Sequence, residues 1–242
     1  MSRVDGRSDG ELRPVTIEPG FVSSATGSAL IACGGTRVIC TASIAEGVPR
    51  WREGRGLGWL TAEYGMLPAS TGQRRPRDIN KGRLDGRIVE IQRLIGRSLR
   101  GVVDNAALGE RTVSIDCDVL EADGGTRCAS ITGGFVALAL ACRRLVDEGE
   151  LERVPLTGEI AAVSCGIVDG RPMLDLNYPE DSSAEVDANV VMTGDGGLVE
   201  VQATAEGMPL ERAHLDDLLE LAAAGITELR AAQDGAIASA GD

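Results

Sequence analysis

The sequence predicts an α+β protein, because short strand-like segments with tight-turn signals alternate with three longer helical segments. Its 242 residues, of which 43% are hydrophobic and 25% charged, are enough for a globular fold with a sizeable core. No linker-like stretch separates the two halves, so we expect one unit over residues 1–242. Each half has hairpins followed by a helix, and an internal duplication with halves at about 1–128 and 129–242 is one interpretation.

Short β-rich runs bounded by turn residues predict four strands in the first half: residues 14–18, 28–33, 37–44 and 59–66. Gly34 and Gly35 lie between the second and third runs, which therefore form a predicted hairpin. Residues 70–85 are polar, basic and aperiodic, and this pattern predicts a mobile loop. Apolar side chains from Ile88 to Val102 then recur at helical spacing, with arginines off the apolar stripe.

A half-buried strand followed by a buried helix is expected next. Apolar and polar residues alternate over residues 113–119, which is the period of a strand with one buried face. The segment Gly124-Gly125-Thr126-Arg127 follows, and a helix is expected over residues 129–147. This helix is almost wholly apolar as far as Cys142, so we expect it to be central and buried.

The second half repeats the hairpin pattern. Its four predicted strands are residues 159–168, 172–177, 186–192 and 198–204. Asp169-Gly170 separates the first two, and glycine-rich residues 194–197 separate the last two, so both pairs are predicted hairpins. An amphipathic helix is expected over residues 210–232.

The cysteines and the histidine exclude several kinds of chemistry. Six cysteines show no CxxC spacing, which favours reduced thiols in a cytoplasmic protein over a disulfide framework or a zinc site. His214 is the only histidine, so mechanisms that need several histidines are excluded. The N-terminal residues lack an apolar signal-peptide core, and the uncharged stretch 128–142 is shorter than the roughly 20 residues of a membrane span. We therefore expect no membrane association.

Basic residues are unevenly spread. The net charge of −13 argues against binding nucleic acid, yet nine basic residues lie between Arg74 and Arg100, opposed only by Asp78, Asp85 and Glu90. Such a local positive field can capture a polyanion, although a solvated helix face and a basic loop fit the charges as well. If RNA binds here, we expect contacts from five arginines: Arg74, Arg75, Arg77, Arg93 and Arg97.

The strand–Gly-Gly-Thr-Arg–helix step predicts a phosphate site. Two glycines let the backbone approach an anion, and the helix start offers free N–H groups and the positive end of its dipole. Thr126 adds a hydroxyl and Arg127 a charged fork. A tight turn capped by Thr or Ser would give the same pattern. Arg87 opposes the dipole at its own helix start, which is better tolerated beside an anion, although a surface arginine explains it too.

Carboxylates gather in the segment YPEDSSAEVD, which includes Asp181 and Asp187 with Glu180 and Glu185 beside them. One or two of these groups could hold a hard divalent cation. An acidic, solvated loop is the alternative interpretation. We expect the segment to lie near the surface, with its four carboxylates repelling one another unless a cation is present.

Longer stretches of the chain resemble the ribonuclease PH family of phosphate-dependent 3′ exoribonucleases, in family order and almost end to end. The matching segments are RVDGRSDGELRPVTIEPGF, GWLTAEYGMLPAST, GRIVEIQRLIGRSLRGVVD, IDCDVLEADGGTRCASITGGFVAL, LDLNYPEDSSAEVDANVVMTG and EVQATAEG. The resemblance is loose only in NKGRLDGR, where Asp85 adds an acid. It implies a duplicated β-α-β-α fold with mixed sheets and packed helices, assembled into a homohexameric ring, a trimer of dimers.

The resemblance also implies residue roles. Arg87 resembles the family arginine that binds inorganic phosphate, and Gly125, Thr126 and Arg127 resemble its phosphate loop. Asp181 and Asp187 resemble the acidic pair that acts with magnesium. The implied reaction is phosphorolysis of RNA 3′ ends, with phosphate as co-substrate and tRNA precursors as the expected substrate.

Two alternatives belong to other classes. An inert, RNA-binding ring subunit of an exosome-like assembly would share the resemblance without the activity. A hydrolytic, metal-dependent 3′ exonuclease would need more metal-ligand carboxylates around one point than the sequence offers.

Overall fold

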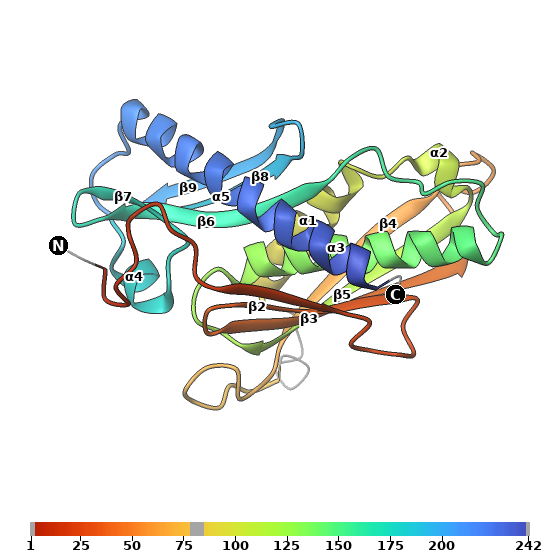
Figure 1. The fold of residues 1–242 in the computed structure, drawn as a ribbon, viewed down its shortest axis with the longest axis horizontal. Coiled ribbons are helices and arrows are strands. Elements are labelled where there is room, and N and C mark those ends of the chain that lie inside the picture. Colours follow the sequence, from red (N-terminus) through yellow and green to blue (C-terminus); the bar gives the residue numbers. More distant parts are fainter. Residues whose placement is uncertain (1–2, 78–84, 241–242) are drawn as a thin grey trace.

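The computed structural model describes residues 3–77 and 85–240, so part of the predicted loop, residues 78–84, lies outside the described residues. Two β-sheets lie on either side of a long central helix (Figure 1). The predicted α+β fold is confirmed, and every predicted strand and long helix is present.

The first sheet has the strand order β1-β2-β3-β5-β4. Its strands are β1 (Val15–Pro19), β2 (Gly27–Cys33), β3 (Thr36–Glu46), β4 (Trp59–Met66) and β5 (Arg111–Glu121). Neighbouring strands are antiparallel except β4 and β5, which are parallel because the chain crosses between them through α1 (Gly86–Arg100) and the short α2 (Asn105–Leu108). This sheet is therefore mixed. Met66 at the end of β4 and Ala122 just after β5 line the same cavity as Arg87 and the Gly124-Gly125 turn, which are predicted phosphate-binding parts of the chain.

The second sheet is antiparallel throughout, with the order β7-β6-β8-β9. Its strands are β6 (Ile160–Val168), β7 (Arg171–Leu174), β8 (Val186–Thr193) and β9 (Leu198–Ala205). Here β8 and β9 are joined directly by a hairpin, whereas β4 and β5 at the edge of the first sheet are joined through α1 and α2. The two sheets therefore differ in their edge connection.

Burial explains why the central helix α3 (Thr126–Asp147) carries so few charged residues. It packs on β2 and β3 on one side and on β6 on the other, and most of its residues are buried (Figure 1). In length and composition it alone among the described helices could cross a membrane, but 78% of the relevant window is buried inside the protein. The last helix, α5 (Arg212–Ser239), covers β6 and β7 and contacts β1.

Several boundaries differ from the sequence prediction by a few residues, and three differences have a local physical reason. The strand predicted over residues 172–177 ends at Leu174, because Asp175 adopts a left-handed backbone with φ of 51°. The last helix runs from Arg212 to Ser239 rather than over 210–232, since no proline or capping glycine ends it earlier. The acidic segment, predicted as a loop, contains a short helix, α4 (Tyr178–Ser183), which a capping box at Asn177 and Glu180 begins.

Candidate active site

The Gly-Gly turn begins the central helix without a side-chain cap. Gly124 and Gly125 both have left-handed backbones, with φ of 77° and 67°. Gly125 is itself the N-cap of α3 and no described side chain bonds to that helix start, so the Thr or Ser cap considered above is wrong. The N–H groups of the first turn therefore remain available to an anion. The Thr126 hydroxyl lies 3.0 Å from the hydroxyl of Tyr64 on β4.

The same turn joins the two halves of the molecule. A Cβ atom on Gly124 would collide with the backbone carbonyl of Leu176, which leads into α4. Thr36 fixes the turn from β3, because its hydroxyl donates to the Gly124 carbonyl at 2.6 Å and accepts from the Asp123 N–H at 2.9 Å. Only glycine permits this close approach, which places the predicted phosphate turn against the acid-bearing segment.

Arg127 is held by a neutral partner. Its Nη1 donates to the Gln202 Oε1 at 2.9 Å and lies 3.6 Å from a Glu90 carboxylate oxygen. The Gln202 amide in turn donates to Glu90 and Glu200, both at 3.1 Å. The guanidinium is therefore oriented largely by an amide, which leaves most of its charge for an anionic ligand.

The other predicted arginines divide between the cavity and the surface. Arg87 is the second residue of α1, where Asp85 caps the helix by accepting the Arg87 N–H at 3.0 Å. Arg87 lines the same cavity as Arg127. Asp85, whose acidity looked unfavourable in the sequence, is thus a helix cap. Arg97 forms an ion pair with Glu200 at 2.7 Å, and Arg93 is exposed on α1.

Asp181 on α4 and Asp187 on β8 face this cavity, and both are half-buried. Burial raises the pKa of Asp181, opposed by the charges of Arg87 and Arg127. Burial and the charge of Asp181 raise the pKa of Asp187, again against those two arginines. The structure thus brings both predicted acids together with both predicted phosphate-binding arginines.

The expected cluster of four carboxylates is wrong. Glu180 is buried, with only 5% of its surface exposed, and does not line the cavity. It forms an ion pair with Arg3 at 2.6 Å. Glu185 is exposed, and its carboxylate accepts the Gly170 N–H at 2.9 Å. The helix α4, which the sequence did not predict, separates Glu180 from Asp181, because successive residues of a helix point in different directions.

The cavity has a volume of about 650 Å³. It is lined by residues of both halves of the chain: Met66, Thr71, Gly72, Gln73, Arg75, Arg87, Ala122, Gly124, Gly125, Thr126, Arg127, Ser164, Tyr178, Asp181, Asp187 and Asn189. The Ser164 hydroxyl is buried without a hydrogen-bond partner among the described residues, so it is a further available donor. Two carboxylates suit magnesium, which keeps several waters, although no described group of three His, Cys, Asp or Glu side chains forms a metal cluster.

The basic loop lies closer to the cavity than its sequence indicated. Arg74, Arg75 and Arg77 lie in an aperiodic segment apart from the predicted phosphate residues in the sequence, but Arg75 lines the cavity itself. Its guanidinium contacts the Met66 sulfur at 3.4 Å, at the end of β4. Arg74 and Arg77 are exposed.

We predict that the double change Arg74→Ala and Arg77→Ala weakens binding of long structured RNA and flattens its salt dependence. The reason is that fewer phosphate contacts release fewer counterions when the RNA binds. Cleavage of a short oligonucleotide should change little. Arg75→Ala should reduce cleavage of both substrates. Binding titrations at several salt concentrations, beside rates on both RNAs, measure this. An equal loss on both substrates in the double variant would place all three arginines at the reaction site.

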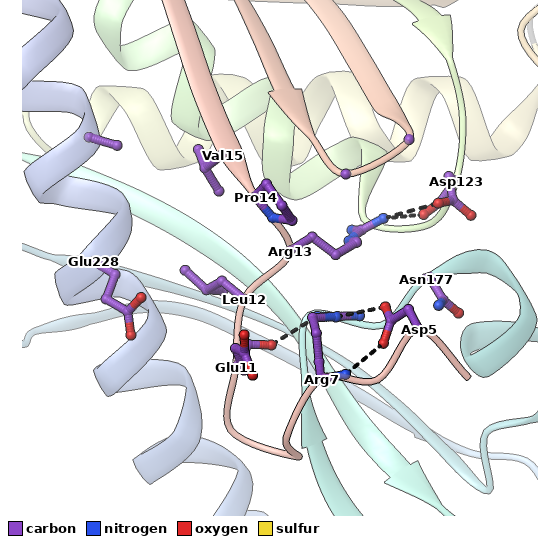
Figure 2. Close-up of a pocket in the computed structure, with 13 residues that line it drawn as sticks. Asp5, Arg7, Glu11, Leu12, Arg13, Pro14, Val15, Asp123, Asn177 and Glu228 are labelled. Carbon is purple, nitrogen blue, oxygen red and sulfur yellow. Dashed lines mark hydrogen bonds and ion pairs between the residues drawn. The ribbon is translucent and has the colours of Figure 1, made fainter. Parts of the chain in front are cut away.

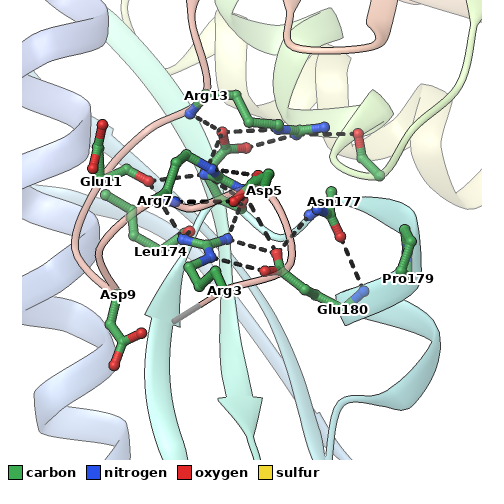
Figure 3. Close-up of polar contacts among 12 residues, drawn as sticks. Arg3, Asp5, Arg7, Asp9, Glu11, Arg13, Leu174, Asn177, Pro179 and Glu180 are labelled. Carbon is green, nitrogen blue, oxygen red and sulfur yellow. Dashed lines mark hydrogen bonds and ion pairs between the residues drawn. The ribbon is translucent and has the colours of Figure 1, made fainter. Parts of the chain in front are cut away.

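A buried ionic network behind the cavity was missed entirely. Its charged members are each less than 9% exposed and tie the N-terminal segment to the second half of the chain: Arg3, Arg7, Arg13, Asp175 and Glu180 (Figure 3). Arg13 bonds Asp175 at 2.7 Å and also donates to the carbonyls of Asp123 and Gly124. Arg13 thus holds the two residues that lead into the predicted phosphate turn. These pairs join residues more than 160 positions apart, and charged residues in an aperiodic terminal segment give no signal of burial.

A larger cavity of about 790 Å³ borders this network (Figure 2). Both arginines that line it already have acidic partners: Arg7 bonds Asp5 at 2.7 Å, and Arg13 lies 3.7 Å from Asp123. Neither predicted acid and neither predicted phosphate-binding arginine lines it. The smaller cavity is therefore the candidate active site.

We predict that Glu180→Gln lowers the free energy of unfolding by about 3–5 kcal/mol, because it leaves the buried Arg3 charge uncompensated. Burial alone would raise the pKa of Glu180, but hydrogen bonds from Arg3 and the Asn177 N–H lower it overall. Its contribution is therefore present above the ordinary value of 4.5 and is lost as pH falls through the lowered pKa.

Denaturant unfolding between pH 3 and 7 tests this, and the variant should lose part of the acid sensitivity. Glu148→Gln is the matched control, since Glu148 pairs with Arg144 at the surface and its loss should cost less than about 1 kcal/mol. Equal stability of the two variants would contradict a structural role for Glu180.

Sequence comparison assigns the class that this fold and cavity leave open: the chain belongs to the 3′ exoribonuclease family. The model for domain 1 of that family matches residues 11–143, and the model for domain 2 matches residues 158–225. Ribonuclease PH of Roseobacter denitrificans is 56% identical over 236 residues, which cover 98% of this chain and all of that relative.

Solved structures agree on the fold. The Archaeoglobus fulgidus exosome with RNA bound to the active site has a TM-score of 0.81 at 25% identity, covering 95% of this chain and 91% of that one. An archaeal exosome core has a TM-score of 0.77 at 25% identity, covering 96% and 91%. Rice (Oryza sativa) Rrp46, at 19% identity, has a TM-score of 0.79 with 97% and 100% covered, and shows the fold alone.

Proposed function

We infer that this chain is a phosphate-dependent 3′–5′ exoribonuclease, which releases 3′-terminal nucleotides as nucleoside 5′-diphosphates and runs in reverse as a nucleotidyltransferase. The observation that carries this conclusion is the 56% identity with Ribonuclease PH over nearly the whole chain. The cavity supports it, because groups suited to free phosphate and groups suited to a metal ion line the same space.

In the reaction, Arg87, Arg127 and the N–H groups at the start of α3 hold inorganic phosphate. A phosphate oxygen attacks the phosphorus of the last phosphodiester, and the bond from that phosphorus to the 3′ oxygen of the preceding nucleotide breaks. The 3′ oxygen takes a proton, which leaves an RNA shorter by one nucleotide and a nucleoside diphosphate. Positioning and charge neutralisation account for the catalysis, and no covalent enzyme nucleophile is needed.

Asp181 and Asp187 are the proposed magnesium ligands. Their oxygen donors, half-buried but reachable from the cavity, fit a hard cation that retains water. When bound, magnesium supplies positive charge that stabilises the scissile phosphate and the leaving oxygen. The raised pKa of Asp187 would also suit a proton donor to that oxygen. Calorimetric magnesium binding separates the two roles, because only loss of a ligand weakens the metal affinity of Asp187→Asn.

The assembly and the RNA follow from the same likeness. We propose a homohexameric ring, a trimer of dimers, since the related solved structures are of exosome assemblies. tRNA precursors with extra 3′ nucleotides are the proposed substrate, and the cytoplasm is the proposed location. Light scattering tests the first proposal, which fails if the particle has other than six chain masses.

One assay tests the function. Short RNA is incubated with magnesium, with and without phosphate, and the products are separated. We expect nucleoside diphosphates only when phosphate is present. Nucleoside monophosphates would instead identify a hydrolase, and the absence of any product would identify the inert ring subunit.

A further inference from the structure

An exposed tyrosine lies at the edge of the candidate active site. Tyr178 is 62% exposed, yet it lines the same cavity of about 650 Å³ as Arg87, Arg127 and the two acids. Its hydroxyl makes no hydrogen bond and its ring no aromatic contact among the described residues, so the side chain contributes little to the fold. The ring is therefore open to a ligand that enters this cavity.

The backbone of Tyr178 is nevertheless fixed. It is the first residue of α4, where the Asn177 side chain caps the helix and Pro179 follows. Its N–H donates to the Asp123 carboxylate at 3.2 Å, which ties it to the loop just before the phosphate turn. The ring is therefore presented at a defined place with only its side-chain torsions free, an arrangement that limits the entropy lost on binding.

Tyr178 and Asp181 lie three residues apart in α4, so their side chains share one face of the helix, with Cβ atoms roughly 5–6 Å apart. Asp181 is a proposed ligand of the metal at the scissile phosphate. Both residues line the same cavity, so the base of a nucleotide whose phosphate lies beside Asp181 can reach the Tyr178 ring. The protein has only six aromatic residues, so few rings could stack on a base.

We propose that Tyr178 stacks on the 3′-terminal base of the RNA and grips the chain end without reading its sequence. Every base offers a π face, so stacking is tolerant of sequence. This tolerance suits an enzyme that removes whichever nucleotide is last. The inference rests on the proposed function, because it uses the RNA substrate and the position of the scissile phosphate.

The experiment compares Tyr178→Ala and Tyr178→Phe on short RNA with either a normal or an abasic 3′-terminal nucleotide. Tyr178→Ala should raise the KM for normal RNA about tenfold, within a range of roughly fivefold to a hundredfold. Its kcat and its KM for phosphate should change less than about twofold. Tyr178→Phe, which keeps the ring, should behave like the unchanged enzyme.

The abasic substrate makes the test specific. The unchanged enzyme should lose as much affinity on abasic RNA as Tyr178→Ala loses on normal RNA, and the combination should lose nothing further. Equal losses for Tyr178→Ala on both RNAs, an unchanged KM, or an altered assembly mass would each overturn the proposal. If the unchanged enzyme releases no nucleoside diphosphate, the proposed function fails, and fluorescence anisotropy with the same two RNAs still decides whether the ring binds the terminal base.

Discussion

Asp187→Asn is expected to fold and assemble normally but to lose at least about a hundredfold in phosphorolytic rate. The substitution keeps the side-chain shape and removes the charge that would hold magnesium, whose stabilisation of the reacting phosphate is worth several kcal/mol. Stability should be unchanged or slightly higher, because the repulsion between Asp187 and Asp181 disappears. Thermal unfolding measured beside rates across a magnesium titration gives both quantities.

Glu185→Gln is the matched control for this experiment. Glu185 lies two residues earlier, is exposed, and bonds the Gly170 N–H outside the cavity, so its variant should keep the normal rate. Wild-type activity in Asp187→Asn would remove Asp187 from the chemistry. Inactivity caused only by unfolding would make its role structural.

The same pair predicts a pH dependence. Both acids have raised pKa values in the folded chain, so each stays protonated to a higher pH than an ordinary aspartate at 3.8. Since metal binding needs the ionised carboxylates, activity should fall on the acid side at a pH above that value. Low pH has the opposite effect on stability. Protonation of these two groups in the folded chain removes an unfavourable buried charge, so it stabilises the folded state and opposes acid unfolding.

The parts of the structure that sequence could predict are those set by local pattern. The strand over residues 59–66 is confirmed at both ends, because alternation and the turns beside it specify it locally. The Gly-Gly turn before the central helix was predicted for the same reason, since two glycines before a helix start are a local signal. The pairing of Arg3 with Glu180 could not be found this way, because only the folded chain brings the two together and each residue alone resembles a surface charge.

The acidic segment shows how one missed element changes a functional interpretation. Without α4, four carboxylates in ten residues resembled one repelling cluster. With it, Glu180 is buried in an ionic network, Glu185 caps a turn, and only Asp181 and Asp187 reach the cavity. A six-residue helix is too short to show a hydrophobic period, so the available signals were its capping box and the proline in its first turn.

Arg127→Ala is expected to raise the phosphate concentration needed for half-maximal activity tenfold to more than a hundredfold, with the KM for RNA little changed. The guanidinium begins α3 beside the uncapped N–H groups, and loss of one charged hydrogen bond costs about 1.5–3 kcal/mol of binding. Arg127→Lys keeps the charge but not the planar fork, so its loss should be intermediate. Arg144→Ala, the same change at an exposed position of the same helix, should leave phosphate use unaltered. Since Gln202 and Glu90 remain bonded to each other without Arg127, the variant should stay folded, and thermal unfolding checks this. A phosphate titration that gives the wild-type value for Arg127→Ala would mean that Arg127 does not bind phosphate.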